Sequence, residues 1–356
     1  MANNKYYRIL SFDGGGIRGL ISTVMLERLE QKLKQHNSDK RLIDYFDIIA
    51  GTSTGSLIAC ALATNRFNAS EIKSLYIRRG IEIFPRLNYV LASLLSRIRI
   101  GFGQPIYDGK GLEKVLKEEL GETFTFVDLA KPTIVTSYDT YNRQAVVFKN
   151  TKTEFEKIPV WEICRSSAAA PVAFPGHKMM NQGFLQYLKA KGFDIPPEGA
   201  IPLIDGGVVA NDPALCAIAE RLRWNSAPPT NPKWNALVEE KVNLENILVA
   251  SFGTGHNLNR IGITEAREWG LLQWASPLRG IPLLDVLFDG SSDAVSYIAE
   301  EILDSRHFRF QPRLDQDLPA FSANPGNMAA MQQVTETFLN QQEIDNKLNQ
   351  LVNMLV

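Results

Sequence analysis

The feature that most constrains this chain is Gly51-Thr52-Ser53-Thr54-Gly55, which lies between the apolar run FDIIA and the Ala-rich run SLIACALA. A strand that passes into a helix through G-x-S-x-G makes a tight turn with the serine at its tip. Gly51 and Gly55 are expected because only tiny residues fit beside such a turn. The Ser53 hydroxyl then lies at a helix N-terminus, where developing negative charge is favoured. The pattern predicts a nucleophile elbow; the alternative is a small-residue turn with a capping serine.

A second glycine-rich segment, FDGGGIRG at 12–19, also follows a short strand-like run and precedes a helix. Glycines allow a sharp turn and bring backbone N–H groups close to an anion. A phosphate-binding P-loop would need Lys and Ser or Thr after Gly19, where this chain has Leu20 and Ile21. A dinucleotide loop would need an acidic residue ending a second strand about 20 residues on, and that stretch is polar. With Ser53 downstream, the loop favours an oxyanion hole built from Gly14, Gly15 and Gly16; a plain tight turn is the remaining alternative.

A serine nucleophile needs a base within hydrogen-bond reach. Asp205 ends the apolar run IPLID and is followed by two glycines, so we expect its carboxylate to point out at the edge of a sheet. An Asx-type turn is the alternative. None of the four histidines lies in a motif; the best placed is His256, after a Gly-Thr-Gly turn. An aspartate that acts directly as base suits an ester better than an amide, because the leaving group is easier to expel.

The spacing of apolar residues predicts strands that alternate with helices. Helices should therefore cover both faces of a largely parallel sheet. The composition shows no break that would mark a second domain. The expected strands are Tyr6–Phe12, Phe46–Ala50, Thr133–Tyr138, Gln144–Lys149, Ile201–Asp205 and Ile247–Phe252, and the expected helices are Ile17–Lys34, Ser56–Thr64, Asn68–Ile77, Trp161–Ala169 and a tail from about Asn327 that includes a 340–356 segment.

The bulk composition excludes several classes of protein. The chain has 356 residues, a hydrophobic content of 45% and a net charge of -1, which argues against binding a nucleic acid polymer. Its three cysteines are scattered, which indicates reduced thiols rather than a disulfide framework, and no Cys/His cluster suggests a metal site. The N-terminus lacks the apolar core of a signal peptide, and no apolar run is long enough to span a membrane. We expect a cytoplasmic protein that is peripheral to the membrane when active.

Together the three motifs resemble the patatin family of lipid acyl hydrolases. Further segments resemble patatins in the same order, from about Tyr7 to about Ile302: YFDIIAGTSTGSLIA, PIYDGKGLEKVLKEELGE, SSAAAPVAFP, LIDGGVVANDPAL and SFGTG. The third motif reads DGG rather than DGA, a variation that the family tolerates. Plant storage patatins carry a secretory leader, which this chain is expected to lack.

The resemblance implies a three-layer α/β/α sandwich with a central, mostly parallel sheet. It implies one catalytic domain over residues 1–356, with 303–356 a C-terminal helical extension packed on it. It also implies that Ser53 is the nucleophile, that Asp205 is the base and that Gly14, Gly15 and Gly16 supply oxyanion amides. The expected activity is phospholipase A-like hydrolysis of acyl esters of phospholipids or galactolipids, with no metal and no cofactor.

Two segments are candidates for lipid contact. Basic and apolar residues alternate over Lys73–Arg99, which suits an element that meets anionic headgroups; a core-facing helix with a solvated basic side is the alternative. The apolar stretch Trp269–Phe288 would line an acyl channel or pack in the core. We expect the 340–356 helix to be a packing or dimer face, so the chain can form an oligomer.

Two further functions stay open from the sequence. Some bacterial patatin-like enzymes of similar size are effectors that degrade the host membrane when a cyclic dinucleotide binds, so a cyclic dinucleotide activator is one expectation. A nucleotide-binding or storage protein that uses the glycine-rich loop without hydrolysis is the alternative from another class.

Overall fold

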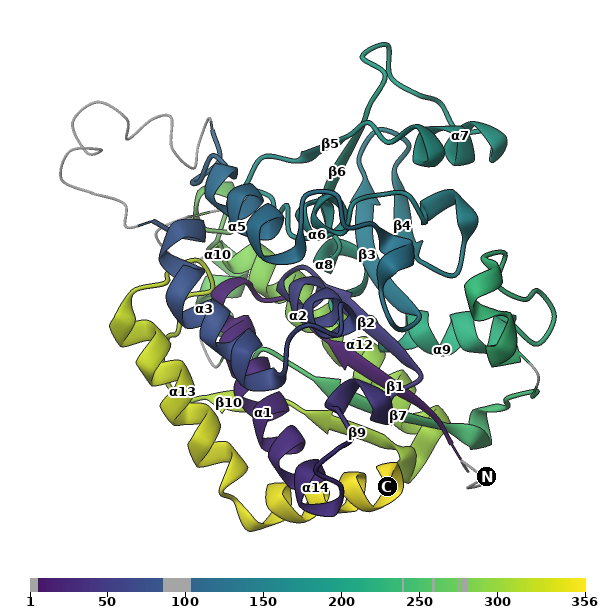
Figure 1. Cartoon of the computed structure of the whole chain (residues 1–356). Helices are drawn as coiled ribbons and strands as arrows, with labels where there is room; N and C mark the ends of the chain where they lie inside the picture. Colours follow the sequence, from purple (N-terminus) through teal and green to yellow (C-terminus); the bar gives the residue numbers. More distant parts are fainter. Residues whose placement is uncertain (1–5, 86–103, 239, 258–259, 275, 277–280) are drawn as a thin grey trace.

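The computed structural model describes residues 6–85, 104–238, 240–257, 260–274, 276 and 281–356. Within these residues a central sheet lies between two layers of helices (Figure 1), with strand order β5-β6-β3-β2-β1-β7-β9 and β4 also paired to β3. A small second sheet pairs β8 with β10. The strands are β1 (Tyr7–Phe12), β2 (Ile48–Thr52), β3 (Thr133–Asp139), β4 (Gln144–Lys149), β5 (His177–Met179), β6 (Ile201–Asp205), β7 (Ile247–Phe252), β8 (His256–Asn257), β9 (His307–Phe310) and β10 (Arg313–Leu314).

Successive strand residues enter two different cores, as the period of two in a strand requires. On one face of the sheet, Leu10 and Ile49 pack with α1, α2, α3, α5, α6, α7, α13 and α14, whereas Ile9 and Ile48 pack on the other face with α9 and α12. The predicted three-layer α/β/α sandwich is confirmed. The helices are α1 (Gly19–His36), α2 (Thr54–Ala63), α3 (Ala69–Ile83), α5 (Lys110–Leu120), α6 (Val160–Ser167), α7 (Gln182–Ala190), α8 (Gly207–Ala210), α9 (Ala214–Arg223), α10 (Ile263–Glu268), α11 (Leu271–Trp274), α12 (Pro282–Leu303), α13 (Pro325–Leu339) and α14 (Gln342–Leu355).

Most predicted elements lie within a few residues of the observed ones, and the differences have local causes. Helix α3 is capped by Asn68 as predicted but runs on to Ile83, because the next proline after Ile77 is Pro85. The C-terminal tail forms two helices that are separated at Asn340 and Gln341. Helix α14 buries its apolar stripe in the core shared with α1, and Lys32 of α1 bonds to Asp345. This face packs inside the protein.

The sequence had suggested that segment 303–356 is a helical extension, but the segment also contains two strands, β9 and β10. Strand β9 pairs in parallel with β7 and extends the central sheet, and β10 pairs with β8. The segment therefore contributes to the central sheet as well as packing two helices on it.

The register of the strands brings the three motifs to one edge of the sheet. Parallel pairing aligns Phe12 of β1 with Gly51 of β2, so the glycine-rich loop and the elbow leave the sheet side by side. Strand β6 runs antiparallel to β3 within this mostly parallel sheet. Its last residue, Asp205, still pairs with Ser137, the residue after the partner of Thr52. Asp205 therefore ends level with Ser53.

Candidate active site

Ser53 occupies a tight turn between β2 and α2. Its backbone has φ 52° and ψ -125°, a strained conformation for a residue with a side chain. A Cβ on Gly51 would lie 2.2 Å from the Gly55 carbonyl oxygen, and a Cβ on Gly55 would lie 2.2 Å from the Phe12 carbonyl oxygen. The turn therefore requires glycine on both sides of the serine, as the G-x-S-x-G pattern predicts.

The Ser53 hydroxyl donates a 2.6 Å hydrogen bond to Oδ2 of Asp205. The other carboxylate oxygen, Oδ1, accepts the Gly207 N–H at 2.8 Å. Asp205 is fully buried, so the carboxylate does not project from the sheet edge as the sequence had suggested. Burial raises the pKa of Asp205 to about 7, and the hydrogen bonds from Ser53 and Gly207 offset this only in part. The structure thus pairs a hydroxyl with a carboxyl that takes up and releases a proton near neutral pH.

The four histidines lie elsewhere. Within the described residues, no hydrogen bond joins His36, His177, His256 or His307 to Ser53 or Asp205. His256 belongs to β8 and its backbone N–H bonds to the Pro312 carbonyl. Among the described residues, Asp205 is therefore the titratable side chain that is hydrogen-bonded to the serine hydroxyl.

The glycine-rich loop lies directly against the elbow, since a Cβ on Gly14 would be 3.0 Å from Cβ of Ser53. The Gly14 N–H is already used: it donates to the Asn211 carbonyl at 3.1 Å. The Ile17 N–H donates to the Ala320 carbonyl at 2.8 Å. In the part of the chain that the structure describes, the N–H groups of Gly15 and Gly16 have no acceptor. Of the three predicted oxyanion glycines, Gly15 and Gly16 therefore have free amides and Gly14 does not.

An apolar cavity opens beside the serine and holds about 810 Å³ of space, part of it open to solvent. Its walls come from the glycine-rich loop, α2, α3 and α5, together with Phe174 and Phe321. Most of the side chains that line it are aliphatic or aromatic: Ile17, Leu57, Ala61, Ile72, Leu75, Tyr76, Ile83, Phe84, Leu112, Val115, Leu116, Leu120, Phe174 and Phe321. Ser53 and Gly16 also belong to its lining, so this apolar space begins at the serine.

The two predicted lipid-contact segments turn out differently. The described part of Lys73–Arg99 lines the cavity through α3, and its Arg79 pairs with Glu82, Glu118 and Glu119 instead of facing open solvent. Residues 86–103 lie outside the described part. No described residue of Trp269–Phe288 lines the cavity, and Leu271 and Leu272 are 78% and 70% exposed. The acyl-channel expectation is therefore wrong for the described part of this stretch, and core packing holds for the buried Ile281, Leu284 and Phe288 but not for the two leucines of α11, which lies on the surface.

The sequence reasoning did not find several residues that hold the site. Ser167 accepts the Ser53 N–H at 2.8 Å, and Thr254 donates to the Gly14 carbonyl at 2.7 Å. Both lie in segments that carry the family resemblance, SSAAAPVAFP and SFGTG, which was a usable signal. Arg309 lies in a charged late segment with no motif around it, and its contacts depend on the tertiary fold.

No group of three or more His, Cys, Asp or Glu side chains among the described residues is placed to hold a metal ion. None of the helices in this part of the chain is both long and apolar enough to cross a membrane.

Comparisons with known proteins agree with the geometry. The family model described as Patatin-like phospholipase matches residues 10–218. The chain is 31% identical over 312 residues to Patatin-like protein 2 of Oryza sativa subsp. indica, and the aligned region covers 82% of this chain and 71% of the relative. It is 32% identical to Patatin group M-3 of Solanum tuberosum over 93% of this chain and 83% of the relative. It is also 35% identical to Probable inactive patatin-3-Kuras 1 of Solanum tuberosum, over 76% of this chain and 69% of the relative.

Among solved structures, the crystal structure of VipD from Legionella pneumophila matches 99% of this chain and 67% of its own chain. Its sequence identity is 12% and its TM-score is 0.42, too distant to carry a functional inference.

Proposed function

Since the chain belongs to the patatin-like phospholipase family and is a lipid ester hydrolase, we propose that Ser53 and Asp205 form its catalytic dyad and that it cleaves acyl esters of membrane lipids. The observation that carries this proposal is the 2.6 Å hydrogen bond from the Ser53 hydroxyl to Asp205, at the mouth of an apolar cavity. The roles proposed for Ser53 and Asp205 follow from that contact.

The first half-reaction acylates the serine. As the Ser53 oxygen attacks the ester carbonyl, its proton passes to Oδ2 of Asp205, and the carbonyl oxygen becomes a tetrahedral oxyanion. The free N–H groups of Gly15 and Gly16 are the donors available to hold that oxyanion. Collapse of the intermediate expels the alcohol, which takes the proton from Asp205, and leaves the acyl group on Ser53.

The second half-reaction reverses these roles with water. Asp205 removes a proton from water, the resulting hydroxide attacks the acyl-enzyme, and the fatty acid leaves as Ser53 regains its proton. A base works best when its pKa lies near the working pH, and burial gives Asp205 a pKa of about 7. An ordinary aspartate would be too weak a base for this step.

The cavity supports a long-chain acyl ester as substrate. Its lining is almost wholly apolar and begins at Ser53, so the hydrocarbon tail would fill it while the ester stays at the hydroxyl. Phospholipids and galactolipids both present such an ester, and the part of the lipid that differs between them would remain outside.

The direct test measures fatty acid release from phospholipid and galactolipid vesicles by wild type, Ser53→Ala and Asp205→Ala. We expect kcat of both variants to fall by at least about 10³-fold, while their unfolding temperatures stay equal to that of wild type or rise. Activity of Asp205→Ala close to wild type would instead indicate another base, with His256 examined first. A wild type that releases no fatty acid would favour the alternative of a storage protein.

Peripheral membrane contact follows from a lipid substrate, and α11 and α12 offer a surface for it. Asp285 of α12 bonds to Arg18, and Phe288 packs against Gly207, so one side of α12 touches both halves of the site. Its other side exposes Leu283, Val286 and Leu287, and the neighbouring α11 exposes Leu271 and Leu272. Exposed apolar patches of this kind mark interaction sites, and a bilayer that carries the substrate is the occupant proposed.

Vesicle sedimentation tests this surface. The double variant Leu271→Glu/Leu272→Glu should bind phosphatidylcholine vesicles more weakly than wild type, while hydrolysis of a short soluble ester stays the same. The matched control is Met180→Glu, which changes an exposed apolar residue elsewhere and should bind as wild type does. Equal binding by all three proteins would contradict the proposal.

Repeating vesicle hydrolysis with and without cyclic dinucleotides tests the regulated-effector hypothesis. Sedimentation equilibrium measures the oligomeric state.

A further inference from the structure

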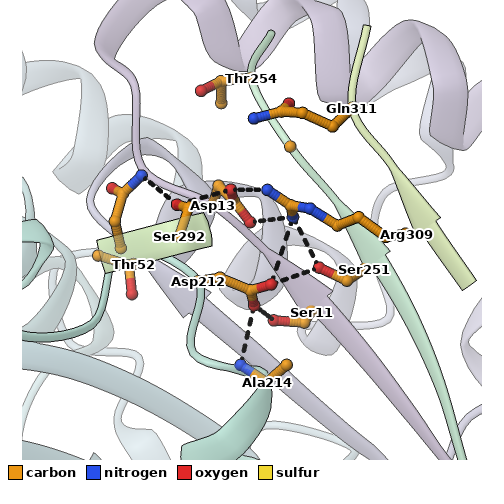
Figure 2. Close-up of polar contacts among 12 residues, drawn as sticks. Ser11, Asp13, Thr52, Asp212, Ala214, Ser251, Thr254, Ser292, Arg309 and Gln311 are labelled. Carbon is orange, nitrogen blue, oxygen red and sulfur yellow. Dashed lines mark hydrogen bonds and ion pairs between the residues drawn. The ribbon is translucent and has the colours of Figure 1, made fainter. Parts of the chain in front are cut away.

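A buried charge cluster lies behind the glycine-rich loop (Figure 2). The Arg309 guanidinium, from edge strand β9, lies between the carboxylates of Asp13 and Asp212. Its Nη1 donates to Oδ1 of Asp13 at 2.7 Å and lies 3.3 Å from Oδ2 of Asp212, while Nη2 binds the second oxygen of Asp13. The side chains of Arg309, Asp13 and Asp212 are 9%, 1% and 0% exposed, so water contributes little to their solvation.

The two carboxylates belong to two of the three chain segments that build the active site, the third being the elbow that carries Ser53. Asp13 directly precedes Gly14 and lies two residues before Gly15, the first glycine of the loop with a free amide. Asp212 follows α8, which starts two residues after Asp205. Ser11 and Ser251 each donate to Asp212 at 2.8 Å, which fixes it against β1 and β7. Arg309 is therefore a single side chain that ties the oxyanion loop to the segment carrying the base.

A second set of hydrogen bonds joins the same two segments. Ser292 of α12 donates to Oδ2 of Asp13 at 3.1 Å and accepts from Nδ2 of Asn211 at 2.9 Å. The carbonyl of Asn211 holds the Gly14 N–H. The side-chain Oδ1 of Asn211 would lie 2.3 Å from a Cβ on Gly14 and 3.0 Å from a Cβ on Gly207, so the Asn211 carboxamide fills the space between the two segments. We call Arg309, Asp13, Asp212, Ser292 and Asn211 the Arg309 cluster.

The charges make Arg309 the critical member. Two buried carboxylates beside each other repel, and one guanidinium that spans both offsets this repulsion. Without Arg309 one carboxyl would have to take up a proton or turn toward solvent. Either change would disturb Asp13, which lies two residues before Gly15 and three before Gly16, the glycines with free amides. A lysine has a point charge and cannot reproduce the planar, two-sided contact.

We propose that Arg309 is a positioning residue for ester hydrolysis, which holds the Gly15 and Gly16 amides at the Ser53–Asp205 pair through Asp13 and Asp212. The proposal rests on the proposed function of this site. Arg309 does not line the cavity, so its loss should spare substrate binding and slow the chemical step. A displacement of about 1 Å in a catalytic group can cost about 100-fold in rate.

The test uses the full chain and a soluble ester, p-nitrophenyl butyrate, with kcat and KM measured separately. For Arg309→Met we expect kcat to fall about 100-fold with KM changed less than about twofold. For Arg309→Lys we expect a smaller fall in kcat, about 10-fold, because lysine keeps the charge but contacts only one carboxylate. Ser292→Ala should lose roughly 3- to 10-fold, the effect of one ordinary hydrogen bond. The rate at which a fluorophosphonate labels Ser53 should fall in parallel, since its tetrahedral adduct uses the same amides.

The matched control is Lys149→Met, which removes the cation of a comparably buried pair between β4 and α9. It should lower the unfolding temperature while kcat stays within about twofold of wild type. Wild-type kcat in folded Arg309→Met would overturn the proposal. So would an equal loss of kcat in Lys149→Met, because the effect would then be one of general stability. If Arg309→Met does not fold, wild-type kcat in both Arg309→Lys and Ser292→Ala overturns it.

These outcomes are distinct from failure of the proposed function. A wild type that cleaves no acyl ester, or a Ser53→Ala protein that still does, refutes the dyad itself. An active wild type, an inactive Ser53→Ala and unaffected Arg309 variants refute only the positioning role.

Discussion

Replacing Asp205 with asparagine should make the stability of this protein less dependent on pH. In the folded state the Asp205 carboxyl keeps its proton up to about pH 7, whereas in the unfolded chain it releases it near its ordinary value of 3.8. The folded state therefore binds more protons between these two values. Its free energy of unfolding must fall as pH rises through that window, because proton release favours the unfolded chain.

The size of the effect follows from the shift. A difference of about 3 pH units at about 1.36 kcal/mol per unit gives about 4 kcal/mol. The amide of Asp205→Asn does not titrate, so this contribution is absent from the variant. Burial also raises the pKa of Asp13 to about 7, but Asp13 is present in both proteins and cancels in the comparison. The free energy of unfolding of Asp205→Asn minus that of wild type should thus increase by about 4 kcal/mol from pH 4 to pH 8.

The assay is equilibrium urea unfolding of both proteins, followed by tryptophan fluorescence at several pH values. In the same preparations kcat of Asp205→Asn at pH 8, where Asp205 of the wild type is ionised, should be lower by at least about 10³-fold, because an amide cannot accept the serine proton. A stability difference that does not change with pH would refute the reasoning, since Asp205 would then titrate as an exposed carboxyl does.

Three further predictions concern the same site. In wild type, kcat/KM for a neutral soluble ester should rise with pH to a plateau above about pH 7, because the base must be ionised; a profile flat from pH 5 to 8 would contradict the assignment. Gly16→Ala should lower both the unfolding temperature and kcat, because Gly16 has φ +59° and a Cβ there would lie 2.3 Å from the Ala320 carbonyl oxygen. The control is Gly192→Ala, at φ +80° with nothing within 4 Å of the added Cβ, which should lose stability only through backbone strain and keep the wild-type kcat. Ala61→Phe should fill part of the cavity and lower kcat/KM for palmitoyl esters at least about 10-fold relative to butyryl esters, whereas an equal effect on both chain lengths would show that the acyl chain lies elsewhere.

Much of the fold could be read from the sequence because its strands are short, apolar and bounded by glycine or proline. Strands β4, β6 and β7 were predicted with their observed bounds, and β1 and β3 within a residue. The direction of β6 could not be read, because an isolated run of five residues carries no signal for parallel or antiparallel pairing. Antiparallel pairing with β3 is what brings Asp205 level with Ser53.

The candidate site divides in the same way. Ser53 and its two glycines sit in a turn whose geometry depends on local residue size, so the pattern alone indicated it. Whether a backbone N–H is free depends on neighbours that are distant in sequence, and the Asn211 carbonyl that occupies Gly14 is 197 residues away. Arg309 was missed for the same reason, because only the folded sheet places it between Asp13 and Asp212.

The surface segment after β8 shows where apolar pattern misleads. Leu271 and Leu272 read as buried because they lie in a long apolar stretch, but the structure leaves them on the outside. Hydrophobicity alone does not distinguish a core from a surface that meets lipid.

Acyl-enzyme trapping tests the central claim most directly. Wild type mixed with a long-chain acyl ester would be quenched in acid within the first turnovers and analysed by intact mass and peptide mapping. The dyad predicts one added acyl group, located on the peptide that contains Ser53 and absent from Ser53→Ala. An acyl group on any other residue, or ester turnover that persists in Ser53→Ala, would contradict the account.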